Sequence, residues 1–473
     1  MEAMNILVNG EWRQTSIKRQ VFNPFENKAV GEICQATSRD IDDAIRSAET
    51  AFHLTKNLSP YERSAALDSV SRSLAEKKEE FAQLITAETG KPISFSRAEV
   101  ERAVFTIATS AEEARRIEGH VLPLDVVPQS GNRAAIIRRF PLGVIGAITP
   151  FNFPLNLVAH KLGPAIASGN TVVLKPSSNA PQTALRFAEL FTKTGLPPGA
   201  INVVPCMGSE IEQLITDKRV KLISFTGSPV VGWGIKVRAA KKKVLLELGG
   251  NAGVIVCADA NMDHALKSIV QGAFGNAGQS CISVQRVYVH ESVAEAFTNH
   301  LVKLAKSIAV GDPTNPRTIV GPMIDEQAAR KVESWIREAT EGGARVLCGG
   351  GRTGAVLEPT VLVDVAPEMK VSCQEAFAPV LTVDKFSEFS DAVERVNASA
   401  YGLQAGVFTN SASDMFYAYR ELEVGGVVIN DASSFRVDHM PYGGVKESGM
   451  GREGVRYAIE EMTEMKLLSL NFS

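Results

Sequence analysis

Apolar residues recur at intervals of three and four, with charged residues between them, through most of the first third of the chain. This pattern covers residues 38–55 and 60–119 and predicts amphipathic helices. Ser38, with Asp40 and Asp42 close behind it, is the expected capped start of the first helix. We therefore predict a helix-rich N-terminal region.

Short β-rich runs alternate with helical stretches from about residue 135 onward, which is typical of parallel βαβ units. The runs before residue 247 are AAIIRRF, GVIGAITP, TVVLKPS, INVVP and KLISFTGS. The alternation then restarts with NAGVIVC, VQRVYVH, ARVLCG, PTVLVDV, APVLTVDKF and GGVVIN, interleaved with helical segments at 262–276, 291–307 and 324–342. We predict two successive α/β blocks, and the cleft between such blocks is a usual place for a ligand.

The composition narrows the class of protein without naming a chemistry. Of the 473 residues, 45% are hydrophobic and 22% charged, and the formal net charge is −3. This is the composition of a folded globular protein, and the balanced charge gives no basic stripe for nucleic acid. No apolar run is long enough to span a bilayer, and no signal peptide is recognisable. We expect a cytoplasmic protein with neither nucleic acid nor a membrane as its partner.

One of the six cysteines stands in an unusual setting. Cys281 lies in FGNAGQSCISVQRVYV, after a Gly-containing loop and before a β-rich run, which leaves room for a substrate to approach its sulfur. The other five are expected to be small buried hydrophobic residues. No Cys or His residues cluster at metal-ligand spacing, so no metal site is expected. Cys281 is therefore a candidate nucleophile, with a structural cysteine as the alternative.

Two polar residues in apolar surroundings could assist a nucleophile. Glu247 interrupts the run VLLELGGNA, and burial raises the pKa of a carboxyl group toward neutrality, which suits a general base. Glu247 also lies 20 residues beyond Gly227, where a dinucleotide fold often keeps a ribose-binding acid, so both roles stay open. Asn152, between two prolines in ITPFNFPLNL, could donate an N–H to a developing oxyanion beside the backbone N–H of Cys281.

Several segments are candidate phosphate or cofactor sites. Two formal G-x-G-x-x-G matches, which begin at Gly349 and Gly449, lack a strand–turn–helix context and are interpreted as turns. The strand-like KLISFTGS instead ends in Gly227 and Ser228 before a helix, whose free N–H groups suit a phosphate. Lys175 places a cation at a strand end. Plain turn and loop positions are the alternatives at both places.

Seven ordered motifs carry a family resemblance. They are TPFNFP (149–154), LKPS (174–177), FTGS (225–228), LELGGN (246–251), GQSC (278–281), EAFAPV (375–380) and PYGGVKESGMGREG (441–454). Because these motifs occur in this order, the chain resembles the NAD(P)-dependent aldehyde dehydrogenase superfamily. The resemblance implies an α/β fold with a Rossmann-like NAD(P)-binding domain, an α/β catalytic domain and a small β oligomerisation element. The implied ranges are 1–121 and 142–246, then 247–458, then 122–141 and 459–473, in a homodimer or homotetramer.

The resemblance also implies roles for residues. Cys281 would attack an aldehyde to give a thiohemiacetal, Asn152 would hold its oxyanion, hydride transfer would leave a thioester, and Glu247 would activate the hydrolytic water. This favours catalysis over ribose binding for Glu247. The implied cofactor-binding residues are Thr149, Pro150, Phe151, Lys175, Ser178, Gly227, Ser228, Glu375 and Phe377. Because Ser178 stands where many NAD-preferring relatives carry a glutamate, we expect NADP to be accepted alongside NAD.

The expected substrate is a small, polar and anionic aldehyde. At Arg102 and Arg436 the chain is similar to non-phosphorylating glyceraldehyde-3-phosphate dehydrogenases, whose matching arginines hold a phosphate, although a third arginine is here Ser280. The motifs FRVDHMPYGGVKESG and NLVAHKLGPAIASGN are also similar to those of lactaldehyde and phosphonoacetaldehyde dehydrogenases. Guanidinium groups pair well with oxyanions, and Phe153 completes the implied substrate site. A lactaldehyde-, phospho-, phosphono- or sulfo-aldehyde would fit.

Three other functions are the alternatives to this one. A CoA-acylating dehydrogenase would pass the thioester to CoA, but such enzymes often lack the glutamate that is present here as Glu247. A succinic-semialdehyde-type dehydrogenase is a second alternative. A non-enzymatic structural relative would be expected to lose Cys281 or Glu247, and both are present.

Overall fold

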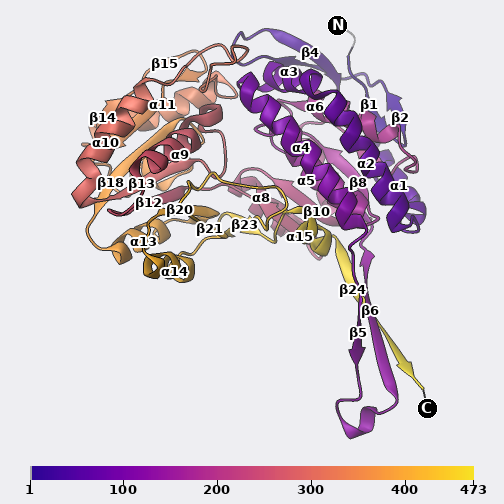
Figure 1. The fold of residues 1–473 in the computed structure, drawn as a ribbon. Coiled ribbons are helices and arrows are strands. Elements are labelled where there is room, and N and C mark those ends of the chain that lie inside the picture. Colours follow the sequence, from indigo (N-terminus) through magenta and orange to yellow (C-terminus); the bar gives the residue numbers. More distant parts are fainter. Residues whose placement is uncertain (1–2, 473) are drawn as a thin grey trace.

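An eight-stranded sheet underlies the first half of the chain in the structure, a computed structural model that describes residues 3–472 (Figure 1). In sheet order its strands are β2 (Glu11–Arg13), β1 (Ile6–Val8), β9 (Ile201–Val203), β8 (Thr171–Lys175), β7 (Val144–Ile148), β10 (Val220–Thr226), β11 (Lys243–Glu247) and β23 (Gly449–Met450). The five strands from β9 to β11 run parallel. Ligands of such sheets bind beyond the carboxyl ends of the strands.

A seven-stranded sheet underlies the second half. In sheet order its strands are β14 (Arg345–Cys348), β17 (Thr360–Val363), β18 (Val380–Phe386), β13 (Val284–His290), β12 (Ala252–Val256), β20 (Gln404–Phe408) and β21 (Gly426–Ile429). All neighbours are parallel except β14 and β17. The predicted α/β fold class is confirmed, and the change of sheet falls between β11 and β12.

Helices of each half pack against the sheet of that half (Figure 1). Those of the first half are α1 (Ser38–Thr55), α2 (Pro60–Glu76), α3 (Lys78–Thr89), α4 (Ile93–Ala114), α5 (Asn156–Ala167), α6 (Pro181–Thr192), α7 (Glu212–Thr216) and α8 (Pro229–Arg238). Those of the second half are α9 (Met262–Phe274), α10 (Glu291–Lys306), α11 (Glu326–Glu341), α12 (Lys370–Cys373), α13 (Phe389–Asn397) and α14 (Ala412–Glu421). Helix α15 (Val455–Glu461) returns to the first half and packs on α4 and α5. No helix within residues 3–472 is both long enough and apolar enough to cross a membrane.

The helical periodicity of the N-terminal region is confirmed, with one correction to its start. Helix α1 does begin at Ser38, but its cap is Thr37, whose side chain accepts the N–H of Asp40. The Asp40 carboxylate in turn accepts the Thr37 N–H at 2.8 Å, which completes a capping box. The predicted helical stretch 60–119 is divided into α2, α3 and α4, and the left-handed Gly90 (φ 68°) ends α3.

Short antiparallel strands that the sequence pattern did not reveal lie at the N-terminus. Strands β1 and β2 form a hairpin through Asn9 and Gly10, both with positive φ, as a tight hairpin turn requires. Two-stranded ribbons elsewhere are β3 (Lys18–Phe22) with β4 (Ala29–Cys34), β15 (Arg352–Thr353) with β16 (Val356–Leu357), and β19 (Tyr401–Gly402) with β22 (Val445–Lys446).

A three-stranded arm projects from the body of the molecule (Figure 1). It consists of β5 (His120–Pro123), β6 (Arg133–Pro141) and β24 (Thr463–Asn471), with β6 in the middle. The run AAIIRRF therefore belongs to an antiparallel sheet and not to a βαβ unit. The expected C-terminal strand begins at Thr463, because residues 455–461 form α15. Several apolar side chains of the arm are exposed, including Met465 (64%) and Leu467 (52%).

Candidate active site

A cavity of about 380 Å³ is lined by residues next to strands of both large sheets. The predicted site residues in its lining are Arg102, Pro150, Phe151, Asn152, Phe153, Gly227, Ser228, Glu247, Cys281, Glu375, Phe377 and Arg436. Thr149, Lys175 and Ser178 are not in this lining, although Lys175 Nζ lies 3.4 Å from Ser178 Oγ. The fold thus brings the proposed nucleophile, base, oxyanion donor and both arginines to one place.

A strained loop presents Cys281 to this cavity. Helix α9 ends at Phe274, and Asn276 (φ 53°) and Ala277 (φ 54°) follow it in left-handed conformations, which cost free energy for residues other than glycine. A Cβ on Gly278 would lie 2.1 Å from the Ala378 carbonyl oxygen, so only glycine fits there. Cys281 itself is half-buried, and burial raises the pKa of its thiol to about 11.

Glu247 is a buried carboxyl group at the end of β11. Neither of its carboxyl oxygens has a hydrogen-bond partner among the described residues, and the residue is 2% exposed. Burial, followed by the charge of Glu453, raises the pKa of Glu247 well above its ordinary value. A carboxyl group with a raised pKa and free oxygens suits proton transfer near neutral pH.

Asn152 lies in the loop that follows β7 and is fixed against the Cys281 loop. Its Nδ2 donates to the Gln279 carbonyl at 3.1 Å, and the residue is 5% exposed. One amide hydrogen is thereby used and the other is left for a further acceptor. This arrangement holds an N–H donor beside the residues that precede the thiol, which is what an oxyanion site requires.

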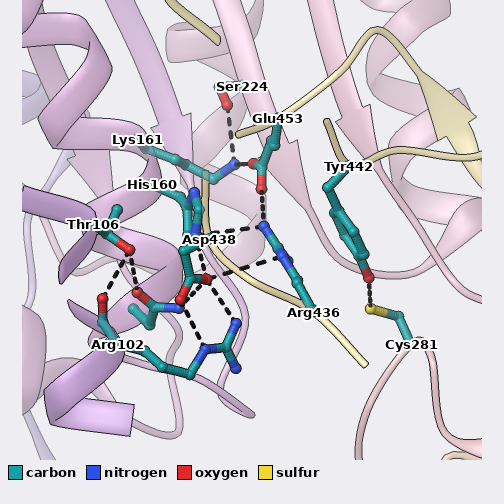
Figure 2. Close-up of polar contacts among 11 residues, drawn as sticks. Arg102, Thr106, His160, Lys161, Ser224, Cys281, Arg436, Asp438, Tyr442 and Glu453 are labelled. Carbon is teal, nitrogen blue, oxygen red and sulfur yellow. Dashed lines mark hydrogen bonds and ion pairs between the residues drawn. The ribbon is translucent and has the colours of Figure 1, made fainter. Parts of the chain in front are cut away.

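Arg102 and Arg436 meet at a shared acid that the sequence analysis did not identify. Arg102 forms a two-point ion pair with Asp438, with Nε to Oδ2 at 2.9 Å and Nη2 to Oδ1 at 2.7 Å (Figure 2). Arg436 Nε lies 3.9 Å from Asp438 Oδ1. Asp438 also accepts from Asn156 Nδ2 at 3.0 Å and contacts His160 Nε2 at 2.9 Å. Burial opposes ionisation of Asp438, but the contacts to His160 and Arg102 outweigh it and hold its pKa well below the ordinary range.

A second buried ion pair lies next to the first and is drawn above it in Figure 2. Lys161 Nζ donates to Glu453 Oε1 at 3.0 Å and to Ser224 Oγ at 2.9 Å. Arg436 Nη2 lies 3.7 Å from Glu453 Oε2. Three cationic side chains therefore face two carboxylates, because burial lowers the pKa of His160 and keeps it neutral. While the neighbouring Glu247 is protonated, as its raised pKa favours, this end of the cavity carries one uncompensated positive charge.

Several residues of this network lie inside motifs quoted for the family resemblance, yet their roles were not predicted. Asn156, His160 and Lys161 belong to α5, whose residues are all buried. Polar and ionisable side chains in an otherwise apolar helix were the available signal, because buried charges need partners. The partners are remote in sequence, since Arg102 and Asp438 are 336 positions apart.

Polar groups at the strand ends fit a dinucleotide. The hydroxyls of Thr149 and Thr226, at the ends of β7 and β10, are buried and have no hydrogen-bond partner among the described residues. Gly227 and Ser228 precede α8. The Gly227 N–H donates to the Glu247 carbonyl at 3.0 Å, and the free backbone N–H groups of the first turn of α8 suit a phosphate. These orphaned donors and acceptors match the hydroxyl and phosphate oxygens of NAD(P).

Glu375 and Phe377 border the same region. Glu375 Oε1 accepts the Gly250 N–H at 2.9 Å, and burial raises the pKa of this carboxyl to about 7. A Cβ on Gly249 would lie 2.4 Å from Glu375 Oε2, so a larger residue there would displace the Glu375 carboxylate. Phe377, with φ 50°, packs edge to face on Phe151 with 5.9 Å between ring centroids.

The remaining cysteines follow the prediction with one exception. Cys34, Cys206, Cys257 and Cys348 are buried. Cys373 is half-buried, with its Sγ 3.2 Å from the Glu368 carbonyl oxygen, so the prediction of a fifth core cysteine was wrong. Cys373 lies at the end of the short helix α12, where little structure covers it.

Comparisons with known proteins identify relatives of the chain. The model of the aldehyde dehydrogenase family matches residues 12–468. The chain is 48% identical to 3-sulfolactaldehyde dehydrogenase of Priestia aryabhattai, over 98% of each chain. It is similar in structure to aldehyde dehydrogenase 21 of Physcomitrella patens in complex with the reaction product succinate (42% identity, TM-score 0.98, 99% and 98% of the chains). It is also similar to a glyceraldehyde-3-phosphate dehydrogenase of Methanocaldococcus jannaschii complexed with NADP (38% identity, TM-score 0.93, 97% and 100% of the chains).

Fold and cavity together define an α/β oxidoreductase with a cysteine and a carboxyl group at one site. The chain belongs to the aldehyde dehydrogenase family, and it is an NAD(P)-dependent enzyme that acts on aldehydes. The resemblance stated from the seven motifs is confirmed, as are the predicted enzyme class and cofactor.

Proposed function

We propose that this enzyme oxidises a small aldehyde that carries one negative charge to the corresponding carboxylic acid. The observation that carries the proposal is the uncompensated positive charge formed by Arg102 and Arg436 around Asp438. A single sulfonate or carboxylate group would neutralise that charge, whereas a phosphate dianion would bring one charge too many. A three-carbon sulfo-aldehyde of the lactaldehyde type, as in the name of the Priestia relative, is the substrate we propose.

The residues that line the cavity have different roles in the proposed reaction. Cys281, as thiolate, attacks the aldehyde carbonyl, and the Asn152 amide together with the Cys281 backbone N–H holds the oxyanion of the thiohemiacetal. NAD(P)+, when bound, accepts the hydride. Glu247 then takes a proton from the water that attacks the thioester, and the acid leaves. Phe153 borders the aldehyde; its ring centroid lies 5.4 Å from the Arg102 guanidinium.

The cofactor would be held along the carboxyl ends of the first sheet. We propose Lys175 and Glu375 for the ribose hydroxyls, Gly227 and Ser228 for the pyrophosphate, and Phe377 for the nicotinamide region. Thr149, Pro150 and Phe151 would line the same channel, and Ser178 would face the adenosine ribose. The orphaned hydroxyl of Thr149 supports this placement.

The deciding experiment is a substrate panel followed by NAD(P)H absorbance. It compares 3-sulfolactaldehyde, succinic semialdehyde, lactaldehyde, phosphonoacetaldehyde and glyceraldehyde 3-phosphate, with Cys281→Ala as the control. We expect kcat/KM to be highest for the sulfo-aldehyde and lower for the two phosphorus-bearing aldehydes. Uncharged aldehydes as the best substrates would contradict the proposal, and a rate that depends on CoA would indicate the acylating alternative.

We also propose the domain and subunit organisation that the family resemblance implies. The ranges are 1–121 with 142–246 for the cofactor domain, 247–458 for the catalytic domain, and 122–141 with 459–473 for oligomerisation. Exposed apolar side chains on the arm and the position of β24 at the edge of its sheet support a homodimer or homotetramer. A cytoplasmic location stays a prediction.

A further inference from the structure

The sulfur of Cys281 makes one hydrogen bond in the part of the chain that the structure describes. Its partner is the hydroxyl of Tyr442, with 2.8 Å between Sγ and Oη (Figure 2). Tyr442 is 4% exposed, and its hydroxyl points from the loop between β21 and β22 at the thiol. The contact therefore joins a buried phenol to the atom that must become a nucleophile.

We propose that Tyr442 is a catalytic residue whose hydroxyl donates a hydrogen bond to the Cys281 sulfur and thereby stabilises the thiolate. The inference rests on the proposed role of Cys281 as the nucleophile. The hydrogen bond requires no exchange of protons between the two side chains: the thiol proton passes to solvent when Cys281 ionises, and Tyr442 keeps its own.

The surroundings of the thiol make such a donor necessary. Cys281 packs against an apolar group formed by Ile282, Leu403 and the Tyr442 ring. A thiolate in apolar surroundings is disfavoured, and burial accordingly raises the thiol pKa to about 11. Glu375 and Glu247, when ionised, oppose ionisation of the thiol further, while the Tyr442 hydrogen bond and the Arg436 charge favour it.

The contact with Arg436 makes the Tyr442 hydroxyl a stronger hydrogen-bond donor. The Arg436 guanidinium carbon lies 3.6 Å from the centroid of the Tyr442 ring, and the arginine side chain is 7% exposed. A cation on the ring face draws electron density from the ring and strengthens the hydroxyl as a donor. Burial nevertheless raises the pKa of the phenol well above its ordinary value, so the hydroxyl keeps its proton.

The backbone fixes the position of the hydroxyl. The Tyr442 N–H donates to the Glu453 carbonyl at 3.0 Å, and the Glu453 N–H donates to the Tyr442 carbonyl at 2.6 Å. Glu453 is held in turn by Lys161. This reciprocal pairing anchors Tyr442 to the buried ion pairs, so the hydroxyl is positioned before any substrate arrives.

The test is the pH dependence of alkylation of Cys281 by iodoacetamide in the ligand-free enzyme, followed by mass spectrometry. Because a hydrogen bond to a charged group is worth about 1.5–3 kcal/mol, Tyr442→Phe should raise the thiol pKa by about one to two pH units. Alkylation at neutral pH should slow by about ten- to a hundredfold. Replacement of Tyr442 by 3,5-difluorotyrosine, a more acidic phenol, should move the pKa the opposite way.

A matched control is available on β13. Tyr288 is also buried beside an arginine, with its hydroxyl 3.2 Å from Arg286 Nη1, and Tyr288→Phe should leave the alkylation profile unchanged. A profile for Tyr442→Phe that superimposes on that of the native enzyme would overturn the proposal. The underlying role of Cys281 fails separately, if Cys281→Ala keeps its dehydrogenase activity.

Discussion

Burial acts on Cys281 and Glu247 in the same direction, toward the neutral form of each group. The cavity therefore holds a nucleophile and a base that are weak in their resting protonation states. Local contacts determine when each ionises: Tyr442 and Arg436 for the thiol, Arg436 and Lys161 for the carboxyl. One arginine thus influences both reacting groups, in addition to the anion that we propose it binds.

Glu247 gives the enzyme a pH dependence of defined sign. Since its pKa is raised well above 4.5, the carboxyl is protonated at low pH and becomes a base only as the pH rises through the raised pKa. We expect kcat to rise with pH in that window when thioester hydrolysis limits turnover. Glu247→Gln should remove this rise and lower kcat by about 100- to 10,000-fold.

Stopped-flow measurement separates this effect from a general loss of activity. The initial burst of NAD(P)H reports hydride transfer, which precedes hydrolysis, and it should survive in Glu247→Gln. Loss of the burst together with turnover would contradict a role for Glu247 confined to hydrolysis.

Arg102 should determine affinity for the anionic group of the substrate. Its side chain is 32% exposed and reaches the cavity, so Arg102→Ala is tolerated better than a change at the buried Arg436. We expect KM for the anionic aldehyde to rise about ten- to a hundredfold, because a charge-assisted hydrogen bond is lost. KM for propanal should change little.

Arg97→Ala supplies a control on the same helix. Arg97 is paired with Glu79 at the surface of α4, away from the cavity. Equal increases in KM for propanal and for the anionic aldehyde in Arg102→Ala would mean that Arg102 is structural.

At the scale of elements, the sequence pattern predicts those helices and strands whose formation depends on residues close in the sequence. Helix α1 and the parallel strands β7, β8 and β10 follow from periodicity within a few residues. The hairpin of β1 and β2 was missed because each strand has three residues, too few to show an alternation. Asn9–Gly10 was the available turn signal. Asp438 was missed because its partner Arg102 lies 336 positions away in the sequence, and only the fold brings the two side chains together.

Helix α6 depends on an acid from another helix. Its N-cap, Ala180, has no side-chain cap, and Glu88 of α3 accepts the N–H groups of Gln182 and Thr183 at 2.6 and 2.9 Å. Glu88→Ala would leave both buried N–H groups unpaired, so we expect the free energy of unfolding to fall by about 3 kcal/mol. Thermal and denaturant unfolding measure this loss. Glu189→Ala, on the exposed face of α6, should change stability by less than about 0.5 kcal/mol.

The loop after β8 should control the choice between NAD and NADP. Ser178→Glu would place a carboxylate near the expected 2′-phosphate and beside Lys175, so we expect NADP affinity to fall about tenfold or more while NAD affinity holds. Fluorescence titration without aldehyde measures both, and Ser178→Gln controls for size. A native kcat/KM for NADP below a thousandth of that for NAD would contradict the interpretation of Ser178.

At the scale of the whole molecule, the arm carries exposed apolar side chains that no packing within the body of the subunit explains. A three-stranded sheet that projects from a folded body and exposes Met465 and Leu467 is expected to be covered by another subunit. The double substitution Met465→Lys with Leu467→Lys should therefore yield smaller particles by light scattering. Val237→Lys, at an exposed valine of α8, should leave the mass unchanged. An unaltered mass for the double variant would count against the arm as the contact.

The pairing of β24 with β6 has a consequence for the timing of assembly in the cell. Residues 463–471 complete a sheet with residues 133–141, which leave the ribosome more than 300 residues earlier. At about 5–20 residues per second, the hairpin of β5 and β6 waits for roughly 15–60 s with one edge open. Subunits that join through the completed arm must therefore meet after β24 has been made, and the interval is set by the number of residues between β6 and β24.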